Sequence, residues 1–307
     1  MKTSAVLACL AAVASALPSG PFKTTKRQAN PEAAAGLTDL DILNFALTLE
    51  WLEATFYQDG IAQLGAEAFT ALGLSAEQVN GLVEVGNTEF AHASFLQGAI
   101  AQGGASPVQP CEYSFPFTDA AGMIQLAAIL ENVGVGAYLG AAQLVSDASI
   151  LTAAGSILTV EARHQTLART IQAQIPVPQP FDAPLTPRMA LSLAVPFIVS
   201  CPEGSNLAIE PFPTLTQVQP AAGEPAVIGA QMVFQSDNLA QATHCAFLSG
   251  GLQPGGAAFS TLDGSGACTI PQNIAGISYV ALVNAAPLDG IVVESSIMAG
   301  PLAIVVS

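Results

Sequence analysis

Two glutamate–histidine pairs with the same spacing are the residues of this sequence best suited to chemistry. Glu89 and His92 lie in the stretch EFAHASF, and Glu161 and His164 lie in VEARHQT. Residues three apart share one face of a helix, so each pair can direct a carboxylate and an imidazole to the same point. The chain has only three histidines. The repeated Glu-x-x-His motif therefore indicates two halves of one metal site.

Two further glutamates have a matching context. Tyr57 follows Glu50 by seven residues, and Tyr138 follows Glu131 by seven residues. Seven residues are almost two helical turns, so each tyrosine should lie on the face of its glutamate, roughly 10 Å along the axis. Both glutamates stand among apolar neighbours and should be buried, where a carboxylate needs a proton, a partner or a metal. Each tyrosine is either an ordinary core residue or a hydrogen-bond donor to a ligand carboxylate at the catalytic site.

Together these residues match the ligand set of a two-metal carboxylate centre in a four-helix bundle. Such a centre takes one Glu from each of two helices and a Glu-x-x-His motif from each of the other two. Mixed carboxylate and imidazole ligands suit iron or manganese, so two Fe or Mn ions are the expected cofactors. Glu53, three residues after Glu50, is the alternative ligand on the first helix. The predicted metal ligands are Glu50, Glu89, His92, Glu131, Glu161 and His164.

Four long helices should position these residues. Apolar spacing and capping boxes predict the first over 38–64 and the second from Ser75 to about 101. The third should run from 118 to about 145 and the fourth, after a break, to 174, before a short fifth helix that starts at Thr186-Pro187. About 15 residues separate the second and third helices, enough to cross the bundle and leave these two helices parallel.

The composition changes after about residue 205. Segments rich in β-branched and aromatic residues alternate there with Gly, Pro and Asp, which predicts an antiparallel β-sandwich. The expected fold is therefore α+β in two domains. A ferritin-like four-helix bundle should span 38–204, a Pro-rich linker 205–220, and the β-sandwich 221–307.

The N-terminus is typical of a secreted protein. An early lysine, an apolar run and Ala-Ser-Ala predict a signal peptide over 1–16. The dibasic pair Lys26-Arg27 predicts the end of a propeptide over 17–27, and a flexible basic linker is the alternative for this segment. The expected location is extracellular or in the cell wall.

Four cysteines would remain in the mature chain, an even number that suggests two disulfides in an oxidising compartment. Three pairings are possible. Cys111–Cys201 with Cys245–Cys268 is favoured, because each pair then stays within one domain.

The mature chain would carry three arginines and no lysine against 23 acidic residues, a formal net charge of −20. Three cations cannot build a basic patch for phosphates, which excludes nucleic acid and anionic membranes as partners. We expect no membrane span in the mature chain, since its apolar runs are too short or contain proline.

The stretches LTLEWLEATFY, EFAHASFL, LENVGVGAYLGAA and VEARHQTLA resemble the secreted ferritin-like domain family. This family includes plant desiccation-related proteins and fungal stress-response and late-sexual-development proteins. The resemblance covers about residues 38–200. It implies a ferritin-like bundle with ligands at the six positions given above, and it implies little about the reaction.

Two functions are compatible with these observations. The first is a secreted di-metal oxidoreductase, ferroxidase-like or manganese-catalase-like, that acts on ferrous iron, O2 or peroxide. The second is a non-catalytic stress or developmental protein of the cell wall or matrix, in which the bundle is a scaffold and the β-domain an adhesion module. A hydrolase is disfavoured, because Ser, Cys and His form no evident nucleophile–base pair. The sequence leaves the oligomeric state open.

Overall fold

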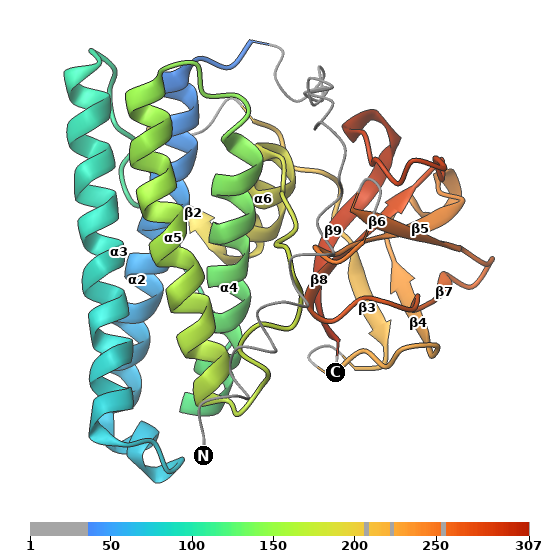
Figure 1. Cartoon of the computed structure of the whole chain (residues 1–307), viewed down its shortest axis with the longest axis horizontal. Helices are drawn as coiled ribbons and strands as arrows, with labels where there is room; N and C mark the ends of the chain where they lie inside the picture. Colours follow the sequence, from blue (N-terminus) through green and yellow to red (C-terminus); the bar gives the residue numbers. More distant parts are fainter. Residues whose placement is uncertain (1–35, 206–208, 222–223, 253–255, 307) are drawn as a thin grey trace, which may run out of the picture.

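The computed structural model describes residues 36–205, 209–221, 224–252 and 256–306. A bundle of long helices lies beside a β-sandwich (Figure 1). This arrangement confirms the predicted α+β fold class, with the ferritin-like bundle first and the antiparallel sheets after it. The predicted signal peptide and propeptide lie outside the described residues.

Four long helices form the bundle, and each begins at a side-chain cap. The predicted capping boxes are both present. The side chains of Thr38 and Ser75 each accept a hydrogen bond from the backbone N–H three residues later, and their own backbone N–H groups donate to the side chain of that later residue. The first helix is kinked at Gly65, whose φ of 71° other residues rarely adopt, so its straight part ends where the sequence predicts. The helices are α2 (Asp39–Ala71), α3 (Ala76–Gln102), α4 (Ala120–Ala141) and α5 (Ala148–Ile171).

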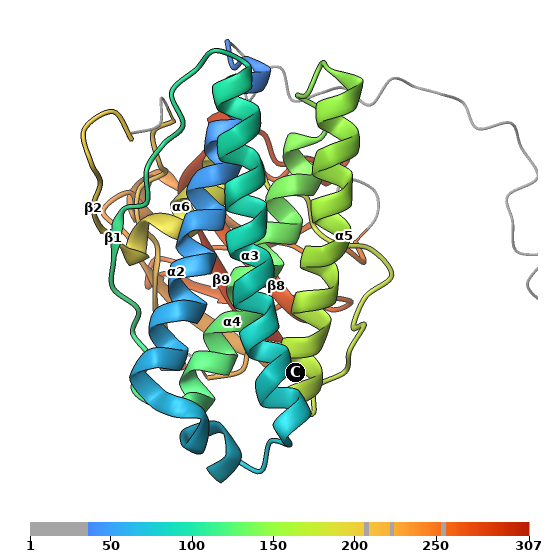
Figure 2. The same ribbon diagram turned by 90° about the vertical axis from the view of Figure 1, so that its left-hand side faces the viewer.

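The segment between α3 and α4 runs the length of the bundle, so these two helices are parallel, as predicted (Figure 2). On the way, strand β1 (Glu112–Tyr113) pairs with β2 (Ile198–Ser200), which follows the short helix α6 (Pro187–Ala194). The disulfide Cys111–Cys201 closes the same junction. The strand pairing and the disulfide therefore hold the connection between α3 and α4 against the segment that follows α6.

Two antiparallel sheets form the C-terminal region, with strand orders β3-β4-β7 and β6-β5-β8-β9. The disulfide Cys245–Cys268 joins β5 to β7 and so links the sheets, which confirms the second of the two predicted pairings. Strand β3 lies within the predicted linker 205–220, as an edge strand next to prolines. The strands are β3 (Thr216–Gln219), β4 (Gln231–Gln235), β5 (His244–Leu248), β6 (Ala257–Thr261), β7 (Ala267–Thr269), β8 (Gly276–Val283) and β9 (Ile297–Val306).

Strand β8 is buried along its whole length, because the four-stranded sheet is covered on both faces. Leu282 packs in the core between the two sheets, whereas Tyr279 belongs to the core shared with the helices. The hydroxyl of Tyr279 donates a hydrogen bond to Oδ1 of Asn132 on α4, at 2.7 Å. The sandwich therefore packs directly on the bundle and supports the helix that carries Glu131.

Helix α4 is the one helix of the described part that is long and apolar enough to cross a membrane by length and composition. Within the protein, however, 72% of its most apolar window is buried. Its composition is that of a central helix packed by protein on nearly all sides.

Candidate metal centre

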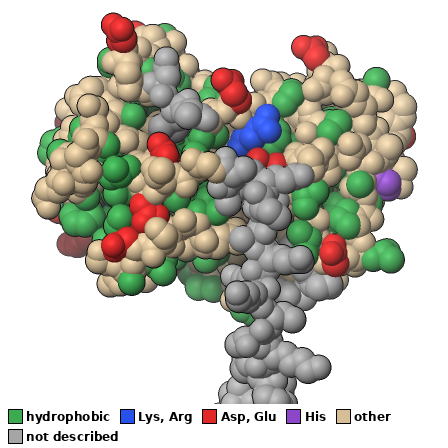
Figure 3. Space-filling view, turned by 90° about the horizontal axis from the view of Figure 1, so that it is seen from above, with side chains coloured by type: hydrophobic (Ala, Val, Ile, Leu, Met, Phe, Trp, Pro, Cys, Tyr) green, Lys and Arg blue, Asp and Glu red, His purple; other side chains and the backbone are tan. Residues whose placement is uncertain are grey.

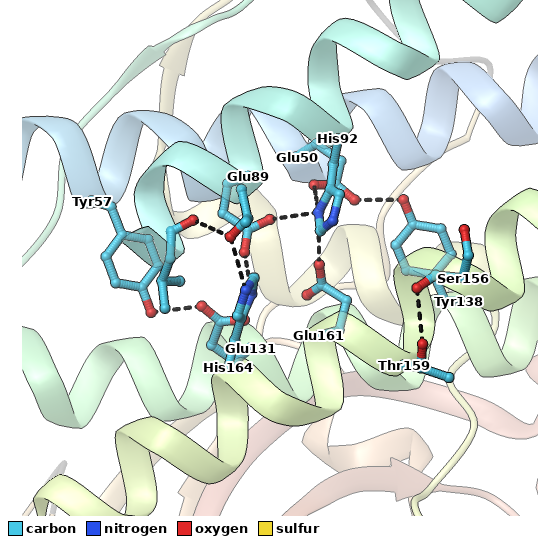
Figure 4. Close-up of polar contacts among 12 residues, drawn as sticks. Glu50, Tyr57, Glu89, His92, Glu131, Tyr138, Ser156, Thr159, Glu161 and His164 are labelled. Atoms are coloured by element: carbon cyan, nitrogen blue, oxygen red, sulfur yellow. Dashed lines mark hydrogen bonds and ion pairs between the residues drawn. The ribbon is translucent and has the colours of Figure 1, made fainter. Parts of the chain in front are cut away.

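The six predicted ligands converge in the interior of the bundle (Figure 4). Helix α2 supplies Glu50, α4 supplies Glu131, and the two Glu-x-x-His motifs come from α3 and α5. All four glutamates are 0% exposed. The structure therefore brings together every residue that the sequence spacing selected.

The ligand atoms fall into two overlapping groups. In the first, Glu50, Glu89, His92 and Glu161 each offer an atom within 4.8 Å of the others, and in the second Glu89, Glu131, Glu161 and His164 do so. Glu89 and Glu161 thus belong to both groups. In contrast, His92 and Glu50 belong only to the first group, and His164 and Glu131 belong only to the second. Two groups that share two carboxylates in this way could hold cations side by side, as the ligand set of two-metal carboxylate bundles does.

Both histidines turn Nδ1 toward the carboxylates. Nδ1 of His92 lies 3.2 Å from Oε2 of Glu50, 3.2 Å from Oε2 of Glu89 and 3.3 Å from Oε1 of Glu161. Nδ1 of His164 lies 2.5 Å from Oε1 of Glu89 and 3.4 Å from Oε2 of Glu131. The two imidazole rings stand 6.1 Å apart, centroid to centroid. Each half of the cluster therefore has its own imidazole nitrogen.

Several of these close contacts are not hydrogen bonds. At least one buried oxygen of each of the four clustered glutamates, and Nδ1 of His164, have no hydrogen-bond partner among the described residues. Buried charges without partners cost several kcal/mol each. A cation placed between these atoms would satisfy them and balance their charge. The residues present thus fit bound metal ions.

The carboxylates raise one another's affinity for protons. Burial raises the pKa of Glu89 and of Glu161 well above the ordinary value, and the charges of neighbouring glutamates add to the shift. Burial alone would lower the pKa of His92, but its contacts with Glu161, Glu50 and Glu89 raise that pKa to about 12. A concentration of negative charge that attracts protons in this way also attracts metal cations.

Each tyrosine bonds the glutamate of the opposite helix. The hydroxyl of Tyr57 on α2 donates to Oε1 of Glu131 at 2.6 Å, and that of Tyr138 on α4 donates to Oε1 of Glu50 at 2.5 Å. Burial, followed by the charge of the bonded carboxylate, raises the pKa of both hydroxyls, which keeps them protonated donors. Each bond fixes Oε1 and leaves Oε2 directed into the cluster.

Thr88, which the sequence analysis did not select, completes the surroundings of His164. Its hydroxyl donates to the backbone carbonyl of Val85 at 2.7 Å, and its Oγ1 lies 2.9 Å from Nε2 of His164. With its own proton used, Oγ1 accepts the Nε2–H. This leaves the lone pair of Nδ1 for the cluster. The only sequence signal was the position of Thr88 directly before Glu89.

Glu53, the alternative ligand on α2, is buried beside the cluster but belongs to neither ligand group. Burial raises its pKa well above the ordinary value, and the charge of Glu161 adds to the shift. Glu53 and Glu161 share the space beside Gly134: a Cβ at that position would lie 3.0 Å from Oε1 of Glu53 and 2.5 Å from Oε2 of Glu161.

Comparison with known proteins agrees with this geometry. Residues 38–174, which include all six clustered side chains, match the family model of the ferritin-like domain. The match agrees with the ferritin-like arrangement of the four long helices. The chain is also similar to Protein rds1 of Schizosaccharomyces pombe (strain 972 / ATCC 24843), with 27% identity over 186 residues. The similarity covers 59% of this chain and 45% of that protein, so the chain spans less than half the length of this relative.

Proposed function

We propose that the ferritin-like domain binds two iron or manganese ions and acts as a secreted oxidoreductase on ferrous iron, O2 or peroxide. The observation that carries the proposal is the sharing of Glu89 and Glu161 between two ligand groups that each contain one histidine. Iron or manganese at such a site would supply the redox chemistry.

Two sets of residues would contribute to the proposed site: those that hold the ions and those that orient the ligands. Glu89 and Glu161 would help to hold both ions, while Glu50 with His92 would help to hold one and Glu131 with His164 the other. Tyr57, Tyr138 and Thr88 would hold three of these ligands in orientation through the hydrogen bonds described above. Because the carboxylates are buried, the site favours small reactants such as O2 and peroxide.

The proposed secretion is supported by the two disulfides, which indicate an oxidising compartment. N-terminal sequencing of the protein from a secreting host should find Gln28 first. An intact residue 1 in the purified protein would contradict this part of the proposal.

Metal analysis and activity assays on the purified protein test the proposal. The wild type should hold about two Fe or Mn ions per chain, oxidise ferrous iron or consume peroxide, and lose both properties in Glu89→Gln/His92→Gln. The control Glu84→Gln changes an exposed glutamate of the same helix and should retain both.

Two outcomes would count against the proposal. A folded wild type that binds neither metal when supplied with each would refute metal binding. A wild type that binds metal but has neither activity would favour the second function, a non-catalytic extracellular protein.

A further inference from the structure

A large apolar cavity opens at one end of the bundle. It has a volume of about 510 Å³ and lies between all four long helices, where α2 and α5 begin and α3 and α4 end (the upper end in Figure 2). Its walls include Phe45 and Leu96, which are 1% and 2% exposed, so the cavity reaches into the core. This volume lies within the range of small-molecule sites in proteins, roughly 300 to 1,000 Å³.

Small side chains create this space. Close-packed helices would normally fill the region between them with side chains of Leu or Ile size. At Gly98 even an added Cβ would meet no atom within 4 Å. The alanines and glycine that line the cavity are Ala46, Gly98, Ala99, Ala137, Ala141, Ala142, Ala153 and Ala154.

The lining selects for a neutral occupant. Among the described residues that line the cavity none is charged, and Ser94, Gln102 and Ser149 supply exposed polar groups. The chain has a formal net charge of −16, and acidic side chains are scattered over the face that Figure 3 views at this end of the molecule. An anionic ligand would therefore meet no cation in the cavity and a repulsive field outside it.

The cavity extends to the edge of the metal centre. Tyr138 lines it, and the hydroxyl of the same residue bonds Glu50. On the other half of the bundle, a cavity of about 340 Å³ lies against Tyr57, with Gln58 and Asn87 in its lining. The two halves are thus alike in their clustered Glu and His residues but differ in the space beside them. The cavity on the Tyr138 side has the larger volume and the more apolar wall.

We propose that the larger cavity is a binding site for a neutral, mainly apolar molecule. The apolar body would lie against the buried wall and the ring of Tyr138, and a polar end such as a hydroxyl or carbonyl would lie at the exposed serines and glutamine. At roughly 30 Å³ for each water-sized group, the cavity holds on the order of 15 to 20 non-hydrogen atoms. None of the six clustered ligands lines it, so binding does not depend on bound metal.

Fluorescence titration with N-phenyl-1-naphthylamine, a neutral apolar probe of this size, tests the proposal. The full chain should show one saturable site. Neutral 1-dodecanol should displace the probe at a concentration at least about tenfold below that needed for dodecanoate, because only the carboxylate carries the unfavourable charge.

Four variants locate the site and separate it from the proposed metal centre. Gly98→Leu and Ala154→Leu place side chains in the cavity and should weaken probe binding about tenfold or more. Gly155→Leu is the matched control: this glycine is also helical, half-buried and open to an added Cβ, but it lies outside the cavity lining. Glu89→Gln/His92→Gln should bind the probe like the wild type, so a failure of the metal proposal would not affect this result.

Three results would overturn the proposal. They are the absence of saturable binding, equal displacement by the alcohol and the carboxylate, and unchanged probe affinity in both filling variants. Light scattering measures whether a second copy of the chain occupies the cavity instead. If the wild type is a dimer that does not bind the probe, and Gly98→Leu is a monomer, the cavity is a dimer interface and the proposal is wrong.

Discussion

Replacement of Gly134 by alanine tests whether metal binding depends on the present position of the Glu161 carboxylate, which belongs to both ligand groups. Gly134 lies on α4, three residues after Glu131, and its added Cβ would lie 2.5 Å from Oε2 of Glu161. Real Cβ atoms essentially never approach another heavy atom within 3.0 Å, and ordinary contact begins at 3.4 Å. Oε2 must therefore move by about 0.5 Å at least, the difference between 3.0 and 2.5 Å.

This displacement is large for a metal ligand. Ligand distances at a metal are defined to within about 0.2 Å, so a shift of the carboxylate that both groups share should weaken both proposed metal positions. Changes to residues that orient ligands typically lower metal affinity 10- to 100-fold, which is about 1.4 to 2.7 kcal/mol. Without metal, alanine favours the helix over glycine by about 1 kcal/mol, so the metal-free variant should be at least as stable as the wild type.

Calorimetric titration of Mn²⁺ into metal-free protein measures the affinity, and thermal unfolding measures the stability. Gly155→Ala is the control, because its Cβ meets no atom within 4 Å and it gains the same helix propensity without touching the cluster. Wild-type Mn²⁺ affinity in Gly134→Ala would refute the reasoning. A large loss of stability in its metal-free form would also refute it, since that would show that Glu161 is unable to move aside.

Three further predictions follow from single contacts. Thr88→Val removes the acceptor for Nε2–H of His164 and should lower Mn²⁺ affinity about 10- to 100-fold by calorimetry, whereas Thr88→Ser should not; equal affinities in both variants would contradict the role of the hydroxyl. Gly140→Ala would place a Cβ 1.8 Å from a backbone carbonyl oxygen of the segment before α6, and it should cost about 1 to 3 kcal/mol or more in circular-dichroism melts. A wild-type melting curve would show that this segment does not pack on α4. Removal of the Cys245–Cys268 disulfide, whose cysteines are 23 residues apart, should cost about 3.5 kcal/mol in denaturant unfolding through loop entropy, and a loss below about 1 kcal/mol would contradict that loop-entropy account.

The sequence predicted the convergence of the ligands because helical spacing is local. Glu89 and His92 share a face whatever the rest of the chain does, and the same holds for Glu161 and His164. The positions of the first two helices followed from the capping boxes at Thr38 and Ser75. The long connection before α4 then allowed α3 and α4 to be parallel, which left few possible arrangements of four helices. Both disulfide pairings were also predicted correctly, because each cysteine was paired with the other cysteine of its own predicted domain.

Other features depended on contacts between helices, which spacing does not specify. The spacing placed each tyrosine on its own glutamate's face, yet Tyr57 bonds Glu131 and Tyr138 bonds Glu50, because a side chain that long reaches across the bundle. Thr88 became a partner of His164 only through the approach of α3 to α5. No local pattern distinguishes such a threonine from an ordinary residue on a helix surface.

By itself, the sequence determined the helices, their caps and the six residues suited to bind metal, since each of these follows from residue type and periodicity along one segment. The tertiary structure alone decided which carboxylates are shared between the two ligand groups and where the edge strand β3 pairs. It also decided where the small residues of four helices meet to leave a cavity. The reason is geometric: sharing, pairing and empty space are properties of several segments at once, and they exist only when the helices and sheets have packed.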